Sequence, residues 1–152
     1  MNNTLIKTII KIIIRIFKNN KKNHQSNTSN EDKWNYMIDL WVDNKLDNPI
    51  KHLITYDNEI NNGGHLQFFQ NNHDELSEII PVIKKYLSKN MSKNLQDAYE
   101  LYLKINPNID SIESYVEVSQ EENFEKFDNY YYEHDKEINK VLTEYSLTLK
   151  IN

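Results

Sequence analysis

The stretch EINNGGHLQFFQN, residues 59–71, contains both glycines of the 152-residue chain, and the two are adjacent. Asn62, Gly63 and Gly64 end a helical pattern of apolar residues, and the pattern resumes from His65 onward. Glycine enters positive φ at little steric cost, which is how helices commonly end. The stretch therefore predicts a corner between two helices. It lacks the spaced glycines and the preceding strand of a phosphate-binding loop.

Apolar residues recur at helical spacing through the rest of the chain after residue 30. The spacing predicts helices over about 31–46, 50–61, 74–87, 92–105 and 133–149, with one or two shorter helices between 110 and 130. Ser29 or Asn30 can cap the first of them, Pro49 suits the first turn of the second, and Ser92 is expected to open the fourth. No segment alternates like a strand. We predict an all-α fold, a compact single-domain bundle of about six to seven helices.

Residues 1–22 predict a basic amphipathic helix. At 100° per residue, five cations share an arc of roughly 80°, and isoleucines occupy the other side. The cations are Lys7, Lys11, Arg15, Lys18 and Lys22. The apolar run is shorter than the roughly 20 residues that span a bilayer. One interpretation is a helix lying on an anionic membrane surface, and the alternative is docking on the body or on a second copy. The polar composition of residues 23–30 predicts a flexible linker, so the domain boundary is expected near Asn30.

Charge is divided unevenly along the chain. Residues 1–33 have a net charge of +5, whereas the remaining 119 residues hold 11 basic and 21 acidic side chains, a net charge of −10. An acidic body disfavours direct nucleic-acid binding and favours a basic protein as the partner.

Six acidic residues of the body follow spacings of three and four. If their segment were one helix, they would share an arc of about 120°. They are Asp110, Glu113, Glu117, Glu121, Glu125 and Asp128. Such a stripe carries one carboxylate per roughly 5 Å, against about 3.4 Å per phosphate along one DNA strand. We expect these residues to bind a basic partner. The alternative is a solvated outer face, and a break near Val118 would split the stripe.

The run from residue 59 to residue 71 also resembles the signature of a bacterial family, largely of unknown function, that is named after a DNA-mimic protein. The residues that carry the resemblance are Glu59, Asn61, Asn62, Gly63, Gly64, Gln67, Phe68, Phe69 and Asn71. FEKFDNYYYE, residues 124–133, is similar to the family's acidic and aromatic C-terminal part, and the resemblance covers roughly 31–149. The family's usual glycine in the next helix is missing. The resemblance implies an all-α fold without known catalysis. For the namesake it implies an acidic surface that occupies the DNA site of a transcription factor.

Other chemistry has little support in the residues. Without cysteine there is no disulfide, thiolate nucleophile or cysteine-bound metal. His65, His73 and His134 lack the spacing of a metalloprotease helix. We therefore expect no metal, no cofactor and no catalytic residues. We expect the protein to be cytoplasmic, and its second expected location is the inner face of the membrane. The functional alternative to DNA mimicry is a membrane-associated scaffold or immunity-type binder that meets its partner through aromatic residues.

Overall fold

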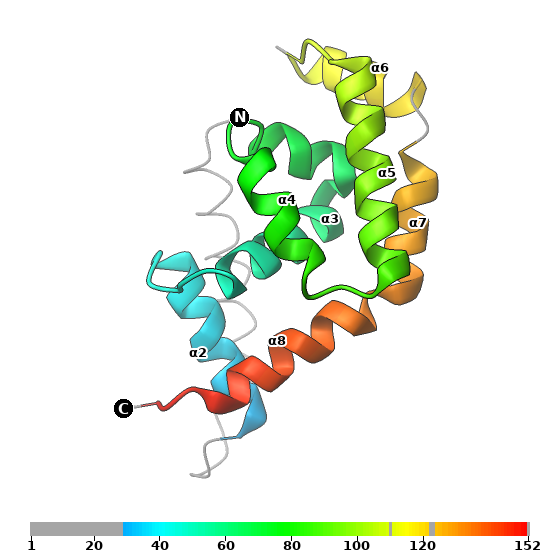
Figure 1. Cartoon of the computed structure of the whole chain (residues 1–152). Helices are drawn as coiled ribbons and strands as arrows, with labels where there is room; N and C mark the ends of the chain where they lie inside the picture. The colour runs from blue at the N-terminus through cyan, green and yellow to red at the C-terminus, as the bar shows by residue number, and fades with distance from the viewer. Residues whose placement is uncertain (1–28, 110, 122–123, 152) are drawn as a thin grey trace. The chain divides into compact units, whose positions relative to one another are not determined.

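The computed structural model describes residues 29–109, 111–121 and 124–151. These ranges contain seven α-helices and no strand, which confirms the all-α prediction. The helices are α2 (Asn30–Val42), α3 (Ile50–Asn71), α4 (Leu76–Lys84), α5 (Lys89–Ile105), α6 (Ile112–Glu121), α7 (Glu125–His134) and α8 (Lys136–Thr148) (Figure 1).

The chain divides into two compact units. Unit 1 comprises residues 1–46 and 143–152, of which 29–46 and 143–151 are described. Within it, the Lys33 ammonium group donates to the carbonyl of Leu147 at 2.7 Å. Ser29 is the N-cap of α2 and forms a capping box with Asp32, a pairing that satisfies donors at the start of the helix. The last turns of α8 therefore belong with α2.

Unit 2, Asp47–Leu142, contains most of the buried apolar side chains. α3 packs against α4, α5 and α7, α4 packs against α5, and α5 packs against α7. Phe68 and Phe69 of α3 are both fully buried, and their rings lie within 5.6 Å of aromatic rings from α3 and α5. Aromatic side chains bury large apolar areas and stabilise the folded state further through edge-to-face and tilted contacts. This packing fixes where α3 meets α5.

Several helix ends differ from the predicted ones because local hydrogen bonds decide them. α5 begins after Ser88, whose hydroxyl accepts from the amide of Met91. Ser92, the predicted start, lies inside the helix, and its hydroxyl donates to the carbonyl of Lys84. α2 ends at Val42 rather than near Leu46, and α4 begins at Leu76 rather than near Asp74. Periodicity locates helices well and their ends poorly.

Candidate functional site

The helix α3 is interrupted at the two glycines, and they do not share one conformation. Gly64 has φ 74° and ψ −174°, a region that is essentially restricted to glycine. Gly63 has φ −170°, so the positive φ at this corner belongs to Gly64 and not to Gly63. A Cβ atom on Gly64 would overlap the carboxylate of Asp128, 2.8 Å from its Cγ. The corner thus requires glycine at 64 for two separate reasons.

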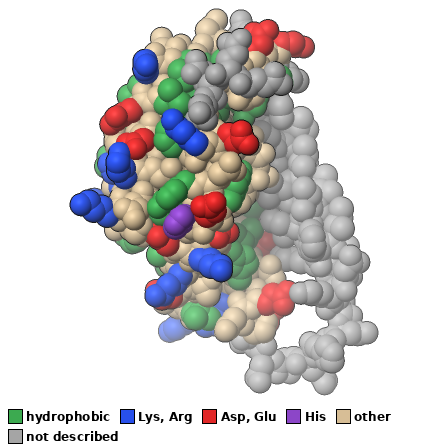
Figure 2. All heavy atoms as spheres, turned by 90° about the vertical axis from the view of Figure 1, so that its right-hand side faces the viewer, with side chains coloured by type: hydrophobic (Ala, Val, Ile, Leu, Met, Phe, Trp, Pro, Cys, Tyr) green, Lys and Arg blue, Asp and Glu red, His purple; other side chains and the backbone are tan. Residues whose placement is uncertain are grey.

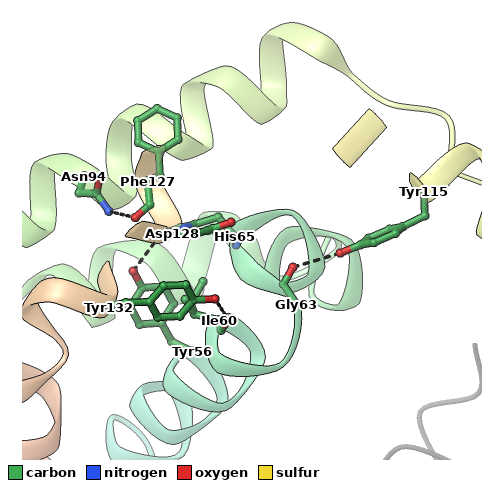
Figure 3. A network of polar contacts seen from close by, with 9 residues as sticks. All are labelled: Tyr56, Ile60, Gly63, His65, Asn94, Tyr115, Phe127, Asp128 and Tyr132. Atoms are coloured by element: carbon green, nitrogen blue, oxygen red, sulfur yellow. Dashed lines mark hydrogen bonds and ion pairs between the residues drawn. The ribbon is translucent and has the colours of Figure 1, made fainter. Parts of the chain in front are cut away.

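Two tyrosine hydroxyls from later helices bind the backbone at the break. Tyr132 of α7 donates to the carbonyl of Ile60 at 3.0 Å, and Tyr115 of α6 donates to the carbonyl of Gly63 at 3.1 Å (Figure 3). Burial raises the pKa of both hydroxyls, and the nearby Asp128 carboxylate raises each pKa further. Both groups therefore stay protonated donors at neutral pH. They bind carbonyls where the regular helical repeat is broken.

His65, directly after the break, is the most deeply buried polar residue of this region. Its backbone amide donates to Asp128 Oδ1 at 2.8 Å, and its Nδ1 lies 2.6 Å from the same oxygen. Its Nε2 lies 3.2 Å from the hydroxyl of Tyr56. Because a carboxylate only accepts, Nδ1 carries a proton, and in the neutral ring Nε2 accepts from Tyr56. The Asp128 carboxylate also lies at the start of the second part of α3, where negative charge is favourable.

This arrangement of Asp128, His65 and Tyr56 resembles an acid–base relay only in its connectivity. His65 and Tyr56 are both 0% exposed, and the rings of Phe69, Phe127 and Tyr131 surround the imidazole. Burial raises the pKa of the Tyr56 hydroxyl, and Asp128 adds to the shift. A general acid or base must reach the substrate proton, and the imidazole and the Tyr56 hydroxyl are enclosed. The arrangement stabilises the corner.

Five polar residues of the 59–71 run form hydrogen bonds within α3. The side-chain amide of Asn61 donates to the carbonyl of Asp57, and that of Asn62 to the carbonyl of Asn58, each at 2.8 Å. One carboxylate oxygen, Glu59 Oε2, accepts from the amides of two later residues. These are Gln67 and Asn71, each at 2.7 Å. Glu59 thereby links the two parts of α3 across the break. The hydrogen bonds of this run therefore support a structural role for its polar residues.

Asp57, six residues before Gly63, accepts a short hydrogen bond from the Tyr131 hydroxyl and a second bond from Asn61. Burial raises the pKa of its carboxyl above the usual 3.8, although both hydrogen bonds oppose the shift. A raised carboxyl pKa means that the folded state favours the neutral acid. The resulting stability is complete below the ordinary pKa and is lost as pH rises through the folded-state value.

The substitution Asp57→Asn is therefore expected to stabilise the protein at pH 7. The amide oxygen still accepts from Tyr131 and Asn61, and no charge is buried. Thermal unfolding of both proteins between pH 3 and pH 7 measures the effect. The variant should melt higher at pH 7, and the difference should vanish toward pH 3, where the parent carboxyl is neutral. A variant that is less stable at pH 7 would show that the ionised carboxylate contributes favourably.

The six acidic residues expected to form one stripe lie in different environments. Glu113 and Glu117 are exposed on α6, and Glu125 is exposed at the start of α7. Asp128 has 17% of its side chain exposed and binds His65. Asp110 and the side chain of Glu121 lie outside the described residues. Two helices carry the described positions, because α6 ends at Glu121 and α7 begins at Glu125.

The role of Asp128 was missed in the sequence, although a local signal existed. Phe124, Phe127 and Tyr131 are buried on one face of the segment, with spacings of three and four. Asp128 is four residues after Phe124 and three before Tyr131, and therefore falls on the same face. An acid inside an apolar stripe indicates a buried partner. The partner is His65, 63 residues earlier. Spacing within one segment does not identify it.

A family model described as DMP19-like protein matches residues 45–150. The chain belongs to the DMP19-like protein family. This agrees at the family level with the resemblance of the 59–71 run. No curated protein and no solved structure matched the chain.

Charge within the DMP19-like region is concentrated near α6 and α7. Residues 105–135 hold nine acidic side chains against one basic side chain, Lys126. Among the described residues, no three His, Cys, Asp or Glu side chains are grouped so that they could hold a metal ion. No helix in the described ranges is both long enough and apolar enough to cross a membrane. Residues 1–22, the membrane-surface candidate with Lys7, Lys11, Arg15, Lys18 and Lys22, lie outside the described part.

Proposed function

We propose that this DMP19-like protein is a non-enzymatic interaction module whose acidic surface binds a basic surface on another protein. In its specific form, the acidic surface occupies the DNA site of a DNA-binding protein such as a transcription factor. The surface, here called the α6/α7 acidic surface, consists of the exposed Glu113, Glu117 and Glu125. Asp128 is left out because its carboxylate binds His65.

The observation that carries this proposal is the excess of acidic side chains in residues 105–135. Figure 2 shows acidic side chains at the top of its face, the end at which Figure 1 places α6. Below them, acidic and basic side chains are interspersed. Glu113 and Glu117 are one helical turn apart, and like charges at this spacing oppose helix formation by a few tenths of a kcal/mol. Local stability therefore does not account for them, whereas attraction to a basic partner does.

The test is the release of proteins from DNA. An extract of the source cells is loaded on duplex-DNA resin at low salt, and the full-length chain is added to elute bound proteins. An eluted protein is then titrated on labelled duplex with the parent and with a triple variant, Glu113→Gln, Glu117→Gln and Glu125→Gln. We expect the parent to displace the duplex and the triple variant to need at least about tenfold more protein, since each charge near a basic partner contributes up to about 1 kcal/mol.

A matched control removes the same charge elsewhere. Asp74→Asn, Glu75→Gln and Glu78→Gln replace three exposed acids just before α4 and in its first turn. This control should displace the duplex like the parent, because its substitutions lie outside the α6/α7 acidic surface. Equal loss in both triple variants would indicate a general charge effect. If the parent elutes no protein from the DNA resin, mimicry of DNA is refuted.

A further inference from the structure

α6 contacts the break in α3 through one tyrosine. Tyr115 lies 52 residues after Gly63, and its hydroxyl binds that residue's carbonyl at 3.1 Å. Figure 3 shows the side chain extending from α6 to the break. Its ring is half-buried, whereas Val116 beside it is 41% exposed. The tyrosine side of α6 therefore faces the break in α3.

The position of Tyr115 determines where the acids of α6 lie. Glu113 and Glu117 are two residues before and two residues after it. At 100° per residue, each carboxylate lies about 160° around the helix from the tyrosine. A helix with Tyr115 on the break must therefore present both acids on its opposite face. Both are exposed, as this geometry requires.

We infer that Tyr115 is a positioning residue that fixes the rotation of α6 and so directs Glu113 and Glu117 outward. A ten-residue helix with like charges one turn apart is marginal by itself and needs a tertiary contact. The Gly63 carbonyl at the break supplies an acceptor for that contact. The consequence for partner binding rests on the proposed function, whereas the anchoring of α6 can be measured without a partner.

Two single-atom variants of the full-length chain test the inference. Tyr115→Phe removes the hydroxyl bound to Gly63, and Tyr132→Phe removes the hydroxyl bound to Ile60 at the same break. Amide hydrogen exchange of residues 115–121 and thermal unfolding are measured for both. Tyr115→Phe should speed exchange in α6 roughly two- to tenfold, the range expected for one hydrogen bond. Tyr132→Phe should have a melting temperature similar to that of Tyr115→Phe, but it should leave α6 exchange unchanged.

Binding is then compared in the duplex-displacement titration. Tyr115→Phe keeps every charge, yet it should weaken displacement severalfold relative to Tyr132→Phe. Unchanged α6 exchange in Tyr115→Phe overturns the inference whatever the binding result. Faster exchange with displacement equal to the parent upholds the anchor but overturns its role in orienting the acids. If α6 exchange is faster in Tyr115→Phe but the parent displaces no protein from DNA, the anchor is upheld and the proposed function is rejected.

Discussion

Replacing Gly64 with valine is expected to destabilise the protein by at least about 3 kcal/mol. The residue has φ 74° and ψ −174°, where a β-branched side chain is strongly disfavoured. Its Cβ atom would also overlap the Asp128 carboxylate, and moving that carboxylate breaks two hydrogen bonds to His65. Thermal or denaturant unfolding of the full-length chain measures the change.

Gly63→Val is the matched control on the adjacent residue. Gly63 has an extended φ, and a Cβ atom there would meet the amide end of Gln67. That end can rotate away and lose its bond to Glu59, at a cost of about 1 kcal/mol. The account therefore requires Gly64→Val to be clearly worse than Gly63→Val. Equal effects would show that the corner does not depend on the left-handed backbone at Gly64.

Asp128→Ala is expected to destabilise the protein by roughly 3 kcal/mol, since it leaves a buried imidazole and a buried amide without their acceptor. Both donors belong to His65, which is 0% exposed. Chemical denaturation at pH 7 measures the loss. Glu133→Ala, which removes an exposed acid later on α7, is the control and should change stability by less than about 0.5 kcal/mol. If the two variants are equally stable, Asp128 is a surface acid after all.

The sequence predicted the fold class because helical periodicity and helix breakers are local signals. The corner after Asn62 follows from two adjacent glycines in a chain that has no others. Helix ends were less predictable: Ser88 and Ser92 are equally good caps by type, and only their hydrogen bonds distinguish them. The division into two units depends on where α8 packs, which periodicity does not specify.

The candidate site was only partly predictable for a different reason. Charge spacing grouped Asp128 with Glu125 because both fit one arc of an ideal helix. In the structure the two acids differ, since Glu125 is exposed and Asp128 binds His65. The contact of Tyr115 with Gly63 joins segments 52 residues apart. Such pairings are properties of the tertiary fold, and no pattern within one segment contains them.

The central claim is that the α6/α7 acidic surface binds its partner through charge, in competition with DNA. The most direct measurement is the affinity of the full-length chain for a protein eluted from duplex-DNA resin, determined from low to physiological salt. The account predicts that affinity falls steeply as salt rises, and that the triple variant Glu113→Gln, Glu117→Gln, Glu125→Gln shows a shallower dependence, since ions screen charge-led binding. An affinity that does not change with salt, equal for parent and variant, would contradict it and indicate binding through apolar contacts.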